Sequence, residues 1–142
     1  MRPMLASPTT FIPEGDEWLH EVKWDGVRVL VDVRDGVVRM TSRNDNDVTP
    51  AWPDLAAPPL GDRDLMVDGE VIALNERGVP DFRVLQHRMH VRNAREVARL
   101  VTSVPATLMV FDLLRLDGED LTGLSQSAQL STTRSGDMTV SR

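Results

Sequence analysis

Apolar residues that alternate with polar ones, or that form β-branched runs, predict β-strands in several parts of the chain. Val27–Val33 and Val37–Thr41 are two such runs, and the Arg34-Asp35-Gly36 sequence that joins them is typical of a tight hairpin turn. Further strands are predicted over Trp18–Lys23, which alternates, over Leu65–Leu74, and over Thr107–Leu116, which ends at Asp117-Gly118.

Two short helices are predicted between the last two of these strands. Asp81 is placed to cap the first helix, and Asn93, with Glu96 three residues later, is placed to cap the second. The apolar residues at helical spacing in the first helix are Phe82, Leu85 and Met89. A single helical turn is predicted within Pro50–Pro59. Together these elements predict an α+β fold of antiparallel sheets with short helices.

The chain has 142 residues, the length of one compact domain or of a piece of a larger one. We expect a folded part over residues 1–124 and a separate tail over residues 125–142, where eight of the 18 residues are Ser or Thr. No apolar run approaches the roughly 20 residues that span a bilayer. Residues 1–15 hold no signal-peptide core, so we expect a cytoplasmic protein without a membrane partner.

Composition excludes several classes of function. There are 16 Lys and Arg against 22 Asp and Glu, and this net charge of −6 argues against a polybasic nucleic-acid coat, although not against a local basic groove. The absence of Cys excludes disulfides, a thiol nucleophile and thiolate metal ligands. Lys23 is the only lysine of the chain. A compositional preference for Arg explains most of this count, but arginine cannot supply a deprotonated amine, so a single lysine among 15 arginines makes Lys23 a candidate for such a role.

Four short motifs follow one another along the predicted strands. They are Lys23-Trp-Asp-Gly-Val-Arg28, Ser42-Arg-Asn44, Asp68-Gly-Glu70 and Phe111-Asp-Leu-Leu114. Each has a plain structural explanation when it is taken alone: the first fits a hairpin turn at Asp25-Gly26, and an isolated Phe111 fits a core residue. A glycine within the third motif would weaken a strand unless a ligand or another backbone comes close to it.

In this order and spacing, the four motifs resemble those of ATP-dependent DNA ligases, members of the covalent nucleotidyltransferase superfamily, over residues 3–124. Pro3-Met-Leu-Ala6 and the segment from Phe82 to Gln86 are most similar to the ligase D type of bacterial end-joining ligases and its stand-alone relatives. The resemblance implies part of an ATP-grasp-like adenylation domain. It also implies nicked or broken duplex DNA as substrate and end-joining proteins such as Ku as partners.

The same resemblance implies a role for particular residues. Lys23 would attack the α-phosphate of ATP and form lysyl–AMP, which requires a neutral amine. Arg28 and Arg43 would bind phosphate or ribose oxygens. The remaining positions implied are Glu21 near the adenine amino group, Glu70 near the ribose, Phe111 stacked on the base, and Glu70 with Asp25 as carboxylates for Mg²⁺ or Mn²⁺.

The sequence also departs from the family pattern. Position 45 is Asp where the family has Gly, and we expect Asp45 to accept the left-handed backbone of that turn. The later lysine motif and the OB-fold domain have no counterpart after Leu124, so we expect a truncated ligase that does not join DNA alone.

Three alternatives stay open: an RNA ligase, a capping guanylyltransferase, and a remnant that binds a nucleotide or a partner without catalysis. His87 and His90 could form a metal pair, although a solvated helix face is the favoured interpretation. The arginines of the 83–99 segment fit contacts with DNA phosphates and an ordinary charged surface equally well.

Overall fold

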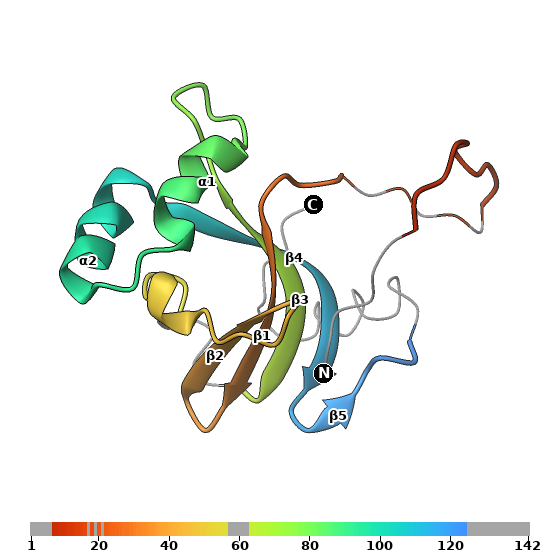
Figure 1. Cartoon of the computed structure of the whole chain (residues 1–142). Helices are drawn as coiled ribbons and strands as arrows, with labels where there is room; N and C mark the ends of the chain where they lie inside the picture. The colour runs from red at the N-terminus through yellow and green to blue at the C-terminus, as the bar shows by residue number, and fades with distance from the viewer. Residues whose placement is uncertain (1–6, 17, 19, 21, 57–62, 125–142) are drawn as a thin grey trace.

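The computed structural model describes residues 7–16, 18, 20, 22–56 and 63–124, and these form a five-stranded antiparallel sheet with two helices (Figure 1). The strand order is β2-β1-β3-β4-β5, so β3 has β1 on one side and β4 on the other. The strands are β1 Val27–Arg34, β2 Val37–Ser42, β3 Leu65–Ala73, β4 Ala106–Leu116 and β5 Glu119–Asp120. The helices are α1 Phe82–Met89, α2 Ala94–Ser103 and the 3₁₀ helix η1 Thr49–Ala51. The predicted α+β class is confirmed, with one sheet among the described residues.

The hairpin turn predicted at Arg34-Asp35-Gly36 is present, and the strand predicted to end at Asp117-Gly118 ends in a second hairpin turn. Asp35 and Gly36 connect β1 to β2 with φ angles of 50° and 74°. Asp117 and Gly118 connect β4 to β5 with φ angles of 49° and 85°. A two-residue loop with both φ angles positive matches the right-handed twist of the strands that it joins, which is why Asp-Gly favours this turn.

The core lies between one face of the sheet and the helical side of the molecule. Alternate residues of β1 are fully buried, and Leu85 of α1 and Trp52 pack against the same cluster. The buried residues of β1 on this face are Val29, Val31 and Val33. The predicted caps are confirmed: the Asp81 side chain accepts from the Arg83 N–H, and the Asn93 side chain accepts from two N–H groups of α2.

The strand predicted over Trp18–Lys23 is wrong, because the described residues of that segment are not in a strand. Trp18 is 53% exposed and Val22 is 68% exposed, so the face of the alternation that carries these two residues is not buried. A strand needs a neighbour to receive its backbone hydrogen bonds, and β1 already has β2 and β3 on its two sides. The hairpin reading of Asp25-Gly26 is therefore also wrong, and these residues lead directly into β1.

Other predictions lie partly or wholly beyond the described residues. The helical turn expected within Pro50–Pro59 overlaps η1 only at its first two residues, because η1 spans Thr49–Ala51, and residues 57–62 are not described. The tail over residues 125–142 is likewise outside the described part, so its separation from the folded part stays a prediction. No helix in the described ranges is long and apolar enough to cross a membrane.

Candidate functional site

Gly26 allows the segment after Lys23 to lie directly against β3. A Cβ built on Gly26 would be 2.1 Å from the Val71 carbonyl oxygen and 3.0 Å from the Glu70 side chain, so only glycine fits at this position. The Gly26 N–H donates to the Glu70 carboxylate. The first motif is thus held on the strand that carries the third motif, and Lys23 itself is exposed a few residues before β1.

Arg28 reaches across from β1 to Asp68 on β3. Its Nε lies 3.0 Å from Asp68 Oδ1 and its Nη2 lies 2.8 Å from Oδ2, a two-point pair between a guanidinium and a carboxylate. The hydrogen bond to Asp68 raises the pKa of Arg28 against the opposing effect of burial. Asp68 is only 3% exposed, so Arg28 supplies the counter-charge of a buried carboxylate.

The Arg28 guanidinium also lies over the ring of Phe111, with its Cζ 5.3 Å from the ring centroid. This distance is within the range of a cation–π contact. Phe111 is partly buried, and the hydrophobic core cluster of the described residues does not include it. The explanation of Phe111 as an ordinary core residue is therefore weakened, and its ring belongs to the same group of side chains as Arg28 and Asp68.

The mid-strand glycine of the third motif is explained by the backbone of β4. A Cβ on Gly69 would lie 2.7 Å from the Met109 carbonyl oxygen, and the β3–β4 register shifts between Asp68 and Gly69. The close approach of the β4 backbone therefore explains this glycine, whereas the sequence alone allowed either a nearby backbone or a nearby ligand. Asp68 and Glu70 flank this glycine and lie on the same face of β3.

Glu70 is directly opposite Arg28 in the β1–β3 register and is half-buried. Burial raises the pKa of Glu70, and the charges of Asp68 and Asp25 act in the same direction. The positive charge of Arg28 and the Gly26 N–H oppose this rise. The negative charge of Asp25 thus acts on the Glu70 carboxylate.

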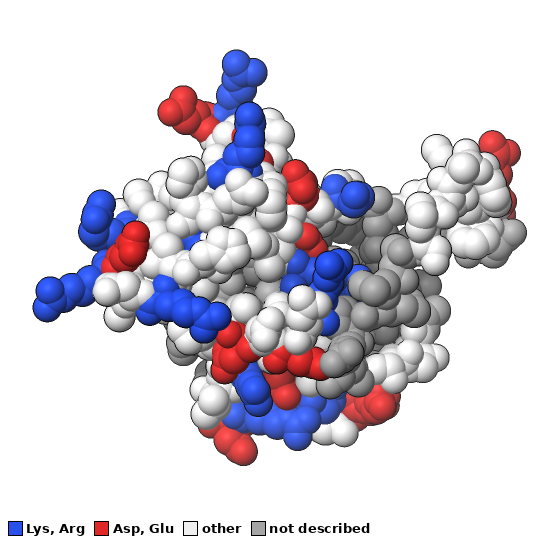
Figure 2. Space-filling model, viewed as in Figure 1, with Lys and Arg blue, Asp and Glu red and all other residues white. Residues whose placement is uncertain are grey.

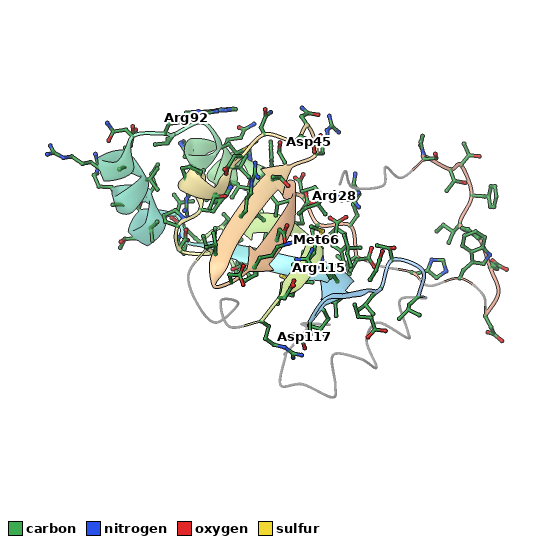
Figure 3. All side chains as sticks on the ribbon, turned by 90° about the horizontal axis from the view of Figure 1, so that it is seen from below. Arg28, Asp45, Met66, Arg92, Arg115 and Asp117 are labelled. Atoms are coloured by element: carbon green, nitrogen blue, oxygen red, sulfur yellow. The ribbon has the colours of Figure 1, made fainter. Side chains whose placement is uncertain are left out.

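The second motif forms a tight turn at the end of β2. The Asp45 N–H donates to the Ser42 carbonyl at 2.9 Å, and Asp45 has a φ of 62°, so this residue accepts the left-handed backbone as expected. Because Ser42 is paired with Val29, the exposed Arg43 lies at the same end of the sheet as Arg28. Figure 3 shows Arg28 and Asp45 at this end.

The structure thus brings five of the predicted site residues to one end of the sheet: Asp25, Arg28, Arg43, Glu70 and Phe111. Glu21 lies outside the described residues. Sequence reasoning missed Asp68 as the partner of Arg28. Its signal was a carboxylate within the apolar run of β3, where a charge needs a partner.

The two histidines near the C-terminal end of α1 are not part of a metal-binding group in the described part of the chain. His87 and His90 are exposed, and the described residues contain no group of three or more His, Cys, Asp or Glu that could hold a metal ion. The interpretation as a solvated helix face therefore stands.

Comparison with known proteins gives consistent matches. Residues 3–132 match the family described as ATP dependent DNA ligase domain. The multifunctional non-homologous end joining DNA repair protein LigD of Mycobacterium tuberculosis is 38% identical over 126 residues, which are 87% of this chain and 15% of that protein. DNA ligase C of the same organism is 39% identical over 124 residues, 85% of this chain and 33% of that protein. The DNA ligase of Pyrobaculum islandicum is 35% identical over 128 residues, 84% of this chain and 22% of that protein.

Solved structures agree with the sequence matches. A mycobacterial DNA ligase D complexed with ATP and MES superposes with a TM-score of 0.66 at 33% identity. The match covers 81% of this chain and 35% of that one. The ligase domain of M. tuberculosis LigD gives the same values. The chain therefore spans only a minor part of the length of these relatives.

Proposed function

Because this chain belongs to the family of ATP-dependent DNA ligase domains, we propose that Lys23 is adenylated by ATP as the first step of sealing breaks in duplex DNA. The observation that carries this proposal is the contact of the Lys23–Arg28 segment with β3. Gly26 packs on the β3 backbone, and Arg28 pairs with Asp68. The only lysine of the chain thus directly precedes a segment that is fixed beside Glu70.

The proposed step is a nucleophilic substitution at phosphorus. The neutral Lys23 amine attacks the α-phosphate of ATP, a P–N bond forms, and the bond from that phosphorus to the pyrophosphate oxygen breaks. The amine loses one proton, and pyrophosphate leaves. Arginine could not replace Lys23, because a guanidinium stays protonated and is a poor nucleophile.

The neighbouring side chains suit the parts of a nucleotide. Phe111 offers an aromatic ring outside the main core, and base–aromatic stacking contributes about 1–3 kcal/mol. The exposed Arg43 could bind phosphate oxygens, whereas Arg28 is already engaged with Asp68 and would act through that pair. Glu70 offers a half-buried carboxylate to ribose hydroxyls.

The carboxylates of Asp25 and Glu70 fit Mg²⁺ or Mn²⁺, because Mg²⁺ commonly binds one or two protein carboxylates together with substrate phosphates. Such an ion would neutralise charge on the leaving pyrophosphate. The names of the end-joining relatives support duplex DNA as the substrate class. Interaction with Ku and location in the cytoplasm stay predictions from the sequence.

The test is incubation of the chain with ATP and Mg²⁺, followed by peptide mass mapping of the AMP adduct. Lys23→Ala and Lys23→Arg should both abolish the adduct. The matched control is the double variant Lys23→Arg/Arg39→Lys, which keeps one lysine but places it on exposed β2, and it should also stay unlabelled. An adduct in any of these variants would contradict the assignment. Transfer from GTP in preference to ATP would instead favour a capping-type guanylyltransferase.

A further inference from the structure

The arginines of the described residues differ in whether they pair with a carboxylate. Most of those on the sheet or packed against it form ion pairs with carboxylates; they are Arg28, Arg34, Arg39, Arg63, Arg88 and Arg115. Five arginines form no salt bridge within the described part of the chain, and all five are exposed. Arg43 and Arg77 lie in separate turns, whereas Arg92, Arg95 and Arg99 are clustered on and just before α2.

Two of these clustered arginines share one side of α2. Arg95 and Arg99 are four residues apart and lie on one face of the helix, and Arg92 directly precedes the N-cap residue Asn93. The buried Val97 and the partly buried Leu100 and Val104 lie on the opposite side. We call Arg92, Arg95 and Arg99 the arginine stripe.

The arginine stripe is only part of the basic run at residues 83–99, because Arg83 and Arg88 bind carboxylates of this chain. Arg88 is 1% exposed and its guanidinium binds Asp54 and two carbonyl oxygens, so it serves the interior. Arg83 pairs with Asp81, the residue that caps α1. Arg88 is therefore buried away from any partner, and the charge of Arg83 is offset by Asp81.

The region around the stripe is positive although the chain as a whole is negative. Residues 74–104 contain six Arg and three Asp or Glu, a formal charge of +3 in a chain of −6. Glu96 is the only carboxylate of α2. Figure 2 shows Lys and Arg side chains projecting from the helical side of the molecule, and Figure 3 shows Arg92 extending outward from that side.

We propose that the arginine stripe binds the phosphate backbone of duplex DNA, at a surface separate from the Lys23 site. The choice of DNA as partner rests on the proposed function. Arginine donates two parallel hydrogen bonds to phosphate, and hydroxyl groups also commonly contact the backbone. Thr102 and Ser103 are exposed beside the stripe.

A protein partner is less well suited to this surface. Protein interfaces are anchored by large apolar or aromatic side chains that fill a pocket at the centre. The residues of α2 that lie among or beside the stripe are small or polar, namely Ala98, Thr102 and Ser103, and its apolar residues face the interior. The stripe therefore offers charge and hydrogen-bond donors without an apolar anchor.

The test is DNA binding by the whole chain, measured by fluorescence anisotropy with a nicked, 5′-phosphorylated duplex at increasing salt. Three phosphate contacts predict a slope of about −2.7 in log K against log [salt], which is a roughly 40-fold loss of affinity between about 50 and 200 mM. The variant Arg92→Gln/Arg95→Gln/Arg99→Gln should bind more weakly at low salt, with a slope smaller in magnitude by about 2.7.

The matched control is Arg34→Gln/Arg39→Gln/Arg63→Gln, which removes the same charge from paired positions outside α2 and should keep the wild-type slope. An equal change of slope in both variants, or no binding by the wild-type chain at low salt, would overturn the proposal. If no AMP adduct forms but only the Arg92/Arg95/Arg99 variant changes the salt slope, the proposed function is wrong and the proposed DNA-binding surface is supported. Circular dichroism checks that each variant is folded.

Discussion

Removing Arg28 should destabilise the fold more than removing Asp68, because the two partners are buried to different extents. The Asp68 side chain is 4% exposed and that of Arg28 is 25% exposed. Arg28→Gln leaves a carboxylate within the sheet without its counter-charge, which costs about 3–5 kcal/mol for a buried pair. Asp68→Asn leaves a guanidinium that can turn toward water, so its cost is about 1.5–3 kcal/mol, the scale of hydrogen bonds to a charged group.

Urea unfolding followed by circular dichroism gives both costs, and the double variant Arg28→Gln/Asp68→Asn gives their coupling. The double variant should cost less than the sum of the single variants by about 0.5–3 kcal/mol. Arg34→Gln, which breaks an exposed pair with Asp32, should cost less than about 1 kcal/mol and is the control. Additive costs, or a larger cost for Asp68→Asn than for Arg28→Gln, would refute the reasoning from burial.

Two further predictions concern the nucleotide side of the site. Phe111→Ala should weaken ATP binding by about 1–3 kcal/mol in titration calorimetry. A loss of about 3–5 kcal/mol of stability with unchanged ATP affinity would instead make Phe111 a core residue. Burial raises the pKa of Glu70, so the folded state binds its proton more tightly than the unfolded state and stability falls as pH rises through the raised pKa. Glu70→Gln should therefore stabilise the protein at neutral pH and have little effect below the ordinary pKa of Glu; the opposite pH dependence in urea unfolding would contradict this.

Features that depend on a few neighbouring residues could be predicted from the sequence. The Asp35-Gly36 turn formed because its φ angles are accessible to these two residues, and its flanking strands pair as expected. Asp81 and Asn93 cap the two helices because their side chains reach backbone N–H groups two or three residues ahead. Asp45 accepts a left-handed backbone for an equally local reason.

Features that depend on a distant partner were missed. The alternation in Trp18–Lys23 gave no information on whether a neighbouring strand would be there to pair with it. Arg88 was placed in a solvated basic run, although its spacing of three from the fully buried Leu85 puts both on one helix face. What makes its burial possible is Asp54, which is 34 residues away in the sequence.

Some motif residues of the site hold the strands together, and others are exposed at the surface of the sheet. Gly26 and Gly69 are needed because β3 is approached closely on both sides, by the segment before β1 and by the backbone of β4. Asp68 fixes Arg28 across the first of these contacts. Lys23 has no comparable packing role among the described residues, and its side chain is exposed shortly before β1 begins. Packing on β3 therefore accounts for Gly26 and Arg28 of the first motif, and the motif alone could not separate this cause from the chemistry of Lys23.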